Sequence, residues 1–226
     1  RMGATINKIW LSLNGKPLLQ YSLAFFEQAP QVNQVIVVAQ EGEIAQTEQL
    51  IAQLRLQKAG LVVAGGSTRL RSVAAALPYI SCTAELVAVH DAARPLLQMA
   101  DWQAVLQAAS LPDYVGAVLA APVTDTIKLL AANEAAPDKS AGAVVGAIEA
   151  TPPRDLLWRA LTPQVFAIEP FIEAYSTMDK DFTDDAALLA ANGGGRVALV
   201  RGSADNIKIT TPRDLQLAQL ILTEEG

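Results

Sequence analysis

The sequence predicts an α/β protein whose strands form a doubly wound, mostly parallel, Rossmann-like sheet. Apolar runs of strand length alternate with helical patterns along the chain. These runs contain Val, Ile, Leu and Ala without polar alternation, which is typical of strands buried on both faces. Strands of this kind that alternate with helices favour a parallel sheet covered by helices on both sides.

Each element of this fold is expected from a local pattern. The expected strands are residues 35–39, 61–64, 86–89, 116–123 and 196–200. The expected helices are residues 18–28, 43–57, 72–77 and 101–109. Two further helices have start signals: Thr183-Asp184-Asp185 precedes residues 186–191, and Thr211-Pro212 with Asp214 forms a capping signature before the last helix. Gly193–Gly195 predicts a tight turn into the next strand.

The strand–helix rhythm fails between residues 126 and 160. This segment contains Ala-, Asn- and Gly-rich stretches, followed by Val144-Val145 and Thr151-Pro152-Pro153-Arg154. We interpret it as an arm that is inserted into a single domain spanning residues 1–226. A lone two-stranded arm is marginally stable in water, so we expect it to need a partner surface, and a homodimer is the simplest partner.

Composition excludes several classes of protein. The chain has 226 residues and a net charge of −6, from 17 basic and 23 acidic residues, which argues against a general nucleic-acid binder. The single cysteine excludes an internal disulfide and fits a reducing compartment, so we expect a cytoplasmic protein. Apolar runs of membrane-spanning length are absent from the sequence. With His90 as the only histidine, a cluster of histidine metal ligands is excluded.

The most informative stretch follows the expected strand 86–89. It reads His90-Asp91-Ala92-Ala93-Arg94-Pro95. Ligands bind at the carboxyl ends of strands in open α/β sheets, where Asp91 could hold a divalent cation and Arg94 a phosphate. This combination suggests chemistry on a phosphorylated substrate. Alternatively, the two side chains form a local salt bridge that closes a loop.

Two other segments allow both a functional and a structural interpretation. Gly65-Gly66-Ser67 follows a strand, and Ser72 stands where the next helix is expected to begin. These residues could let a ligand approach the backbone and donate hydrogen bonds to it, or could form an ordinary turn with a serine cap. Asp205 and Lys208 lie three residues apart between a strand and the last helix, and alone they indicate a solvated turn.

Nine segments in order give the chain a family resemblance. They are Arg1-Met2-Gly3, Asn7-Lys8, Gly15 to Leu19, Gly65 to Val73 (without Thr68 to Leu70), Val89 to Pro95, Pro122 to Lys128, Leu161 to Gln164, Thr183-Asp184 and Ala204 to Lys208. Together they resemble the 2-C-methyl-D-erythritol 4-phosphate cytidylyltransferases, which belong to the sugar and polyol-phosphate nucleotidyltransferases with a GT-A-like fold. The resemblance covers the whole chain. Its most specific motifs are residues 89–95 and 204–208.

The resemblance implies transfer of CMP from CTP to 2-C-methyl-D-erythritol 4-phosphate, with release of pyrophosphate, in the non-mevalonate route to isoprenoids. Arg1 and Lys8 match residues that would stabilise charge on the α-phosphate as the acceptor phosphate attacks. Gly66, Ser67 and Ser72 match positions that cradle cytosine and ribose. Asp91 would lie by the ribose and by phosphates bound to Mg²⁺, with Arg94 near the methylerythritol.

The acceptor side of the site is implied in the same way. Thr126, Arg154 and Lys208 match residues that hold the attacking phosphate, and Thr183 is also expected to contact substrate. In the family, Thr126 and Arg154 lie on an arm that reaches into the other subunit's site. The active unit would therefore be a homodimer with exchanged arms.

Some departures and rival functions remain open. The family's Gly-rich loop and a preceding strand would stand before Arg1, so we expect the sequence to begin inside the protein, and a removed plastid transit peptide would place it in the stroma. Asn7 stands where proline usually precedes Lys8, and Asp185 where glutamate is commoner.

The closest rival function is that of a ribitol 5-phosphate cytidylyltransferase. A non-catalytic nucleotide-binding homologue is the rival from another class.

Overall fold

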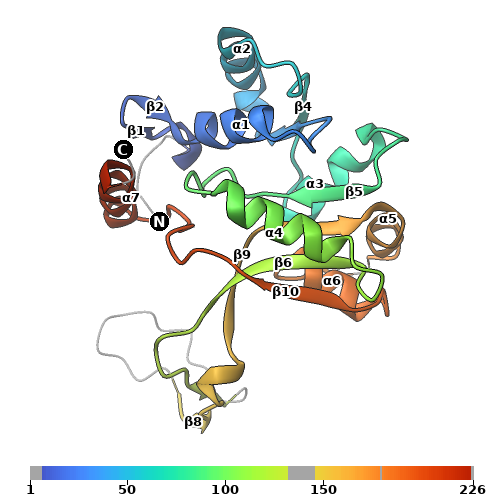
Figure 1. Cartoon of the computed structure of the whole chain (residues 1–226), viewed down its shortest axis with the longest axis vertical. Helices are drawn as coiled ribbons and strands as arrows, with labels where there is room; N and C mark the ends of the chain where they lie inside the picture. Colours follow the sequence, from blue (N-terminus) through green and yellow to red (C-terminus); the bar gives the residue numbers. More distant parts are fainter. Residues whose placement is uncertain (1–6, 132–145, 179, 225–226) are drawn as a thin grey trace.

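The computed structural model describes residues 7–131, 146–178 and 180–224. Its strands are β1 (Ser12–Leu13), β2 (Lys16–Pro17), β3 (Ile36–Ala39), β4 (Leu61–Ala64), β5 (Leu86–Val89), β6 (Gly116–Pro122), β7 (Leu129–Leu130), β8 (Ile148–Ala150), β9 (Trp158–Ala167) and β10 (Val197–Arg201). Its α-helices are α1 (Leu18–Gln28), α2 (Ile44–Leu54), α3 (Arg69–Ala76), α4 (Met99–Ala109), α5 (Ile168–Ser176), α6 (Asp185–Ala191) and α7 (Pro212–Glu224). The α/β class is confirmed (Figure 1).

The largest sheet is mixed, which corrects the prediction of a mostly parallel sheet. Its strand order is β10-β6-β9-β5. β10 runs parallel to β6, whereas β9 runs antiparallel to both β6 and β5. β9 was not expected because Pro163, which has no N–H to donate, argues against a central strand. The register of β9 against β6 shifts between Val118 and Ala120, opposite residues 161–163, and this irregularity accommodates the proline.

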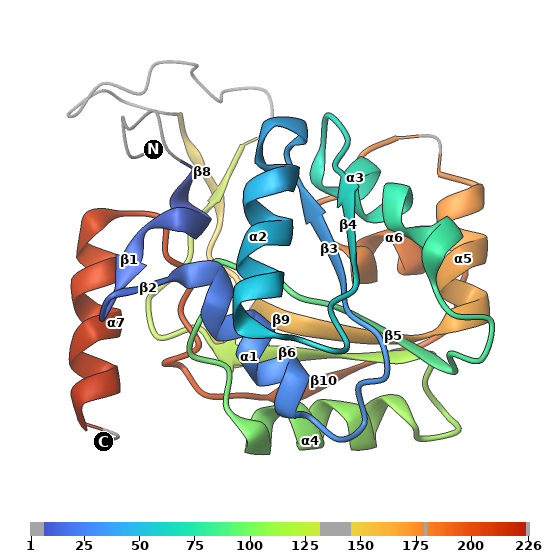
Figure 2. The same ribbon diagram turned by 90° about the horizontal axis from the view of Figure 1, so that it is seen from above.

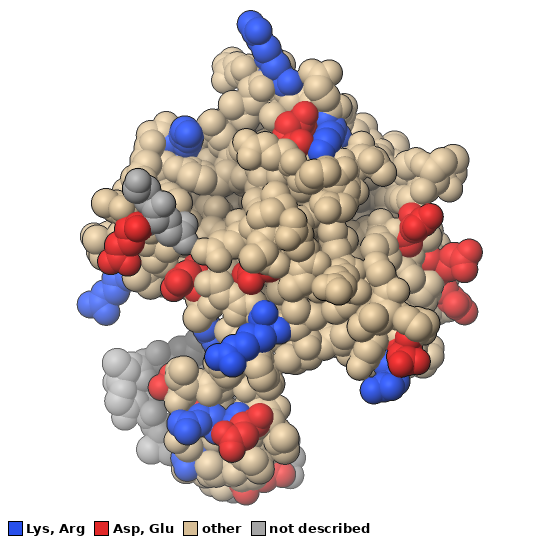
Figure 3. Space-filling model, viewed as in Figure 1, with Lys and Arg blue, Asp and Glu red and all other residues tan. Residues whose placement is uncertain are grey.

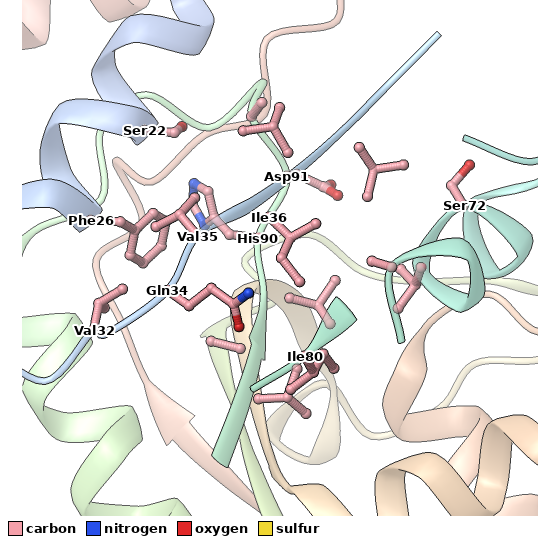
Figure 4. Close-up of a pocket in the computed structure, with 18 of the residues that line it drawn as sticks. Ser22, Phe26, Val32, Gln34, Val35, Ile36, Ser72, Ile80, His90 and Asp91 are labelled. Atoms are coloured by element: carbon pink, nitrogen blue, oxygen red, sulfur yellow. The ribbon is translucent and has the colours of Figure 1, made fainter. Parts of the chain in front are cut away.

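β3 and β4 form a separate parallel pair. In the described part of the chain, β3 makes no ladder with β5, and both strands have one edge without a strand partner. A cavity of about 1230 Å³ lies between them, and residues 35–39 and 84–93 line its two long sides. Figure 4 shows Val35, Ile36, His90 and Asp91 among the residues that line this cavity.

Helices cover both faces of the mixed sheet (Figure 2). On one face, Trp102 and Val105 of α4 pack with Phe26 of α1 against Leu119 and neighbouring residues of β6 and β9. On the other face, Phe171 of α5 and side chains of α3 and α6 pack against β6 and β9. β6 and most of β9 are therefore buried on both sides, whereas the edge strands β5 and β10 are only partly buried, which corrects the expectation that every apolar run is buried on both faces.

The ends of the helices follow their sequence signals, with one exception. Asp184 caps α6 by accepting a hydrogen bond from the Ala187 N–H at 2.9 Å. Thr211 and Asp214 form the expected reciprocal capping box at the start of α7, with the Thr211 N–H donating to Asp214 Oδ2 at 2.7 Å. Helix α3, however, begins at Arg69 with Thr68 as its N-cap, so Ser72 lies inside the helix rather than at its start.

A small lobe extends from the ends of β6 and β9 (Figure 1). Within the expected arm, 126–160, the described residues form the antiparallel hairpin β7–β8 and the short 3-10 turn Arg154–Leu156. β9 begins at Trp158, so the last residues of the expected arm belong to the central sheet. In Figure 3, acidic and basic side chains both lie on this lobe, while the rest of this face carries scattered charges.

Candidate functional site

Asp91 and Lys208 meet beyond the carboxyl end of β5. The Lys208 Nζ atom donates to Asp91 Oδ2 at 2.6 Å, although the two residues are 117 positions apart in the sequence. The Asp91 side chain is 21% exposed and the Lys208 side chain 39% exposed. Burial raises the pKa of Asp91, but the hydrogen bond and charge of Lys208, together with nearby arginines, lower it overall. Asp91 is therefore a carboxylate at neutral pH.

The segment that carries Lys208 is held against the loop that carries Asp91. Arg94 donates to the Asn206 carbonyl at 2.7 Å and, more weakly, to the Ala160 carbonyl at 3.4 Å. The fully buried Asn206 side chain donates to the Thr162 carbonyl at 2.8 Å. Arg94 thus ties together the two sequence motifs, and its terminal nitrogens are engaged with backbone. The expected solvated turn at 205–208 is instead part of the site.

His90 supports this loop from behind. Its ring lies edge-on to Phe26, with centroids 5.2 Å apart. Burial lowers the pKa of His90 to about 4, so the imidazole is neutral at physiological pH. The Asp91 N–H donates to Thr162 Oγ1 at 3.1 Å, and Thr162 Oγ1 lies 3.2 Å from His90 Nδ1. The Arg94 carbonyl can only accept, so His90 Nε2 carries the proton and donates to it. The unprotonated Nδ1 then accepts from the Thr162 hydroxyl.

Lys8 lies in the same electrostatic neighbourhood. Burial and the nearby Lys208 ammonium lower the pKa of Lys8, while Asp91 acts in the opposite direction. Asn7 fixes the turn that begins at Lys8, because its Oδ1 accepts from the Ile9 N–H at 3.4 Å and its Nδ2 donates to Glu43 at 2.9 Å. The asparagine that departs from the family pattern therefore still positions the lysine.

The loop after β4 forms another wall of the cavity, and Gly66, Ser67 and Ser72 all line it. The Ser72 hydroxyl accepts from the Gly66 N–H at 3.1 Å and donates to the Thr68 carbonyl at 2.8 Å. A Cβ atom at Gly66 would lie 2.5 Å from the Arg71 Cβ, so the loop requires glycine there. Figure 4 shows Ser72 on a helix that is set apart from Asp91, and both residues line the cavity.

Arg69 and Asp185 extend the site, and the sequence reasoning missed both. Arg69 Nη2 donates to Asp185 Oδ2 at 2.7 Å, and Arg69 Nε lies 3.8 Å from Asp91 Oδ1. The Asp185 side chain is fully buried and also accepts from the Tyr175 hydroxyl. The available signal was an arginine directly after the Gly-Gly-Ser-Thr turn, where it lies close to any ligand in that loop.

Three expected site residues lie away from this cluster. Thr126 and Arg154 are exposed on the arm, where Arg154 donates to the Thr124 carbonyl at 3.0 Å, and neither lines the cavity. Thr183 is exposed before α6 and also does not line it. Arg1 lies outside the described residues. The structure therefore brings together Lys8, Gly66, Ser67, Ser72, Asp91, Arg94 and Lys208.

Comparison with known proteins identifies the family. The family model for 2-C-methyl-D-erythritol 4-phosphate cytidylyltransferase (IspD) matches residues 1–224. The chain belongs to this family. It is 39% identical over 229 residues to the enzyme of this name from Symbiobacterium thermophilum, covering 100% of this chain and 89% of that protein. It is 37% identical over 228 residues to that from Halalkalibacterium halodurans, covering 100% and 92%.

Solved structures of the family share the fold. The 2-C-methyl-D-erythritol 4-phosphate cytidylyltransferase from Thermus thermophilus superimposes with a TM-score of 0.73 at 31% identity, covering 96% of this chain and 94% of that one. The 4-diphosphocytidyl-2C-methyl-D-erythritol synthase from Anaerococcus prevotii gives a TM-score of 0.81 at 22% identity, covering 95% and 93%, and this likeness concerns the fold alone. The chain is thus a cytidylyltransferase, which confirms the resemblance and the enzyme class. Among its described helices, none has the length and apolarity to cross a membrane.

Proposed function

We propose that this cytidylyltransferase transfers CMP from CTP to 2-C-methyl-D-erythritol 4-phosphate at the Asp91–Lys208 end of the cavity, with release of pyrophosphate. The observation that carries the proposal is the convergence of Asp91, Lys208 and Lys8 beside the Gly66–Ser72 loop. One carboxylate and two cations suit a reaction in which a phosphate oxygen attacks a triphosphate.

The nucleotide would occupy the side of the cavity formed by the loop after β4. Backbone and hydroxyl groups at Gly66, Ser67 and Ser72 offer donors and acceptors to a pyrimidine and its ribose. Ser72 already uses its hydroxyl within the loop, so it orders the backbone at Gly66 as much as it faces a ligand. The requirement for glycine at position 66 fits a loop whose backbone approaches a flat base closely.

The transfer itself needs positioning and charge stabilisation more than covalent help. An acceptor phosphate oxygen forms a bond to the α-phosphorus of CTP, and the bond between that phosphorus and the bridging oxygen to the β-phosphate breaks. The electron pair leaves with pyrophosphate. Lys8 would stabilise the charge on the α-phosphate, together with Arg1. Lys208 would hold the attacking phosphate.

Mg²⁺ fits this site as an ion shared with the substrate. In the part of the chain that the structure describes, no group of three or more His, Cys, Asp or Glu side chains could hold a metal. Asp91 supplies one carboxylate, which suits a Mg²⁺ ion that keeps several waters and binds phosphate oxygens. When bound, this ion would neutralise charge on the triphosphate. Asp91 is the residue that would hold it.

The acceptor side would be completed by the arm of a second copy in a homodimer. Thr126 and Arg154 lie on the arm and do not line the cavity of their own chain. The arm exposes large apolar side chains, with Leu156 77% and Ile148 62% exposed. A two-stranded hairpin with such a surface is typical of an element that is buried against a partner. A cytoplasmic location stays a prediction.

Pyrophosphate release from CTP tests this function directly. We expect release that depends on both methylerythritol phosphate and Mg²⁺, and much slower release with ribitol 5-phosphate. Omission of the acceptor controls for simple CTP hydrolysis. Equal turnover of the two acceptors would contradict the proposed substrate, and release without an acceptor would contradict the transfer reaction.

A further inference from the structure

Arg69 connects two carboxylates of very different burial. One terminal nitrogen pairs with Asp185 at 2.7 Å, and Nε faces Asp91 at 3.8 Å. Asp185 is fully buried, and Asp91 opens onto the cavity. Charges therefore alternate along a chain from Lys208 through Asp91 and Arg69 to Asp185.

The two cations beside Asp91 differ in how firmly they are held. Arg69 lies on helix α3 and is anchored by Asp185, which in turn accepts from the Tyr175 hydroxyl. Its Nη1 atom is buried, and its side chain is 31% exposed. Lys208 is the more exposed of the two cations. Among the ion pairs of the described residues, Lys208 pairs with Asp91 only, whereas Arg69 pairs with Asp91 and Asp185. Lys208 is thus the cation that can turn toward an arriving phosphate.

We propose that Arg69 is a positioning residue that holds the Asp91 carboxylate in place when Lys208 turns to the substrate phosphate. This inference rests on the proposed function, because it assigns Lys208 to the acceptor and Asp91 to the Mg²⁺–nucleotide complex. A guanidinium suits the task because its nitrogens diverge and can face two carboxylates at once, whereas an ammonium acts as a single point charge. Arg69 would act on CTP through Asp91 and would not contact the nucleotide.

The alternative is that Arg69 only compensates the buried charge of Asp185. A buried carboxylate without a partner is costly, so this role would also retain an arginine here. The two roles differ in their consequence. Compensation of Asp185 affects folding stability alone, whereas positioning of Asp91 also affects the binding of Mg²⁺–CTP.

Arg69→Lys separates the two roles, with Arg71→Lys as the matched control. Lysine keeps a positive charge for the buried Asp185 but cannot reach both carboxylates. Arg71 lies two residues along the same helix and is exposed. We expect Arg69→Lys to weaken Mg²⁺–CTP binding, measured by calorimetry, by roughly tenfold, which is within the range for coupled contacting residues. Arg71→Lys should bind as the wild type does.

Repeating Arg69→Lys in an Asp91→Asn background decides the question. If Arg69 acts through Asp91, the substitution should change Mg²⁺–CTP binding less than twofold in that background. An equal loss with and without Asp91 would overturn the proposal, and so would unchanged binding in the single variant. If Arg69→Lys does not fold, the double variant Arg69→Gln with Asp185→Asn removes both charges of this pair. It should show the same tenfold loss of Mg²⁺–CTP affinity. Wild-type affinity in the double variant would overturn the proposal. Wild-type turnover with methylerythritol phosphate, measured on the same preparation, tests the proposed function separately.

Discussion

The cavity end at Asp91 and the arm at Arg154 differ in how their functional side chains are held. Around Asp91, the backbone N–H, both carboxylate oxygens and the neighbouring Arg94 all have partners within the same chain. On the arm, Arg154 has a backbone contact to Thr124, and the surrounding apolar residues are exposed. Contacts within the chain therefore hold the side chains around Asp91 in place, whereas the side chains on the arm have few such contacts.

This difference indicates that the site has a preorganised half and a half that must be completed. Preorganised charges act without further reorganisation during the reaction, which suits the groups that face the nucleotide. Groups on a protruding hairpin gain a fixed position only when the hairpin packs against another surface. We therefore expect substitutions near Asp91 to lower activity whether or not the chain has dimerised. Substitutions on the arm should lower activity only through the dimer.

Lys208→Ala should produce the largest loss. It removes the proposed contact with the attacking phosphate and one of the two cations beside Asp91. We expect kcat/KM for the acceptor to fall on the order of 10²- to 10³-fold, with a larger rise in KM for the acceptor than for CTP. Steady-state kinetics with each substrate varied in turn measures this split. Lys16→Ala, an exposed lysine on β2, serves as the control; equal rises in both KM values would contradict the assignment.

Arg154→Ala should give a smaller loss, about tenfold in kcat/KM for the acceptor, because it removes one charge-assisted contact to a phosphate. The sharper measurement mixes this variant with Lys208→Ala. If arms are exchanged in a dimer, a mixed dimer contains one site with both residues intact.

Mixing the two variants should therefore restore up to roughly a quarter of wild-type activity, since about half the dimers are mixed and half of their sites are complete. The control is each variant alone at the same total protein concentration. If both residues act within one chain, mixing restores nothing, and the proposed exchange of arms is wrong.

The sequence predicted the cavity half of the site better than the fold around it. The motifs 89–95 and 204–208 are local in sequence, and the apolar strand before Asp91 indicates that Asp91 lies at the carboxyl edge of a sheet. Their contact could not be derived from the residues alone, because 117 positions separate Lys208 from Asp91 and only the path of the chain brings them together. The family resemblance supplied that link.

The missed elements depend on tertiary context. β9 contains Pro163, and the irregular pairing of β9 with β6 is what allows a proline there. Arg69 precedes the helix expected from Ser72, and Asp185 belongs to a helix start signal, so neither residue indicated a site by its pattern. Their pairing arises because α3 and α6 pack on the same face of the sheet, a fact that helix periodicity does not contain.

Leu156→Glu should weaken dimerisation while leaving each chain folded. Leu156 is 77% exposed on the arm, so a charge costs the isolated chain little but would be buried without a partner in an exchanged dimer. Sedimentation velocity should show a shift toward monomer at low micromolar protein. Leu220→Glu, on α7 at 63% exposure, is the matched control and should leave the distribution unchanged. Equal effects of the two substitutions would show that the arm does not mediate dimerisation.

Asp214→Asn should have the smallest effect and should leave catalysis unchanged, because the capping box of α7 lies outside both halves of the site. Hydrogen bonds from Thr210 and Thr211 lower the pKa of Asp214. The folded state therefore favours the carboxylate, so this stabilisation is present above the unfolded pKa of about 3.9 and is lost as the pH falls through the lower folded pKa. We expect a loss of about 1 kcal/mol or less in the free energy of unfolding at pH 7, measured by urea denaturation, with Asp113→Asn as an exposed control. The difference between the two variants should disappear below that pH range, since a protonated Asp214 accepts hydrogen bonds no better than asparagine does. A difference that persisted there would assign the stability of α7 to packing of its apolar face on β1 rather than to its cap.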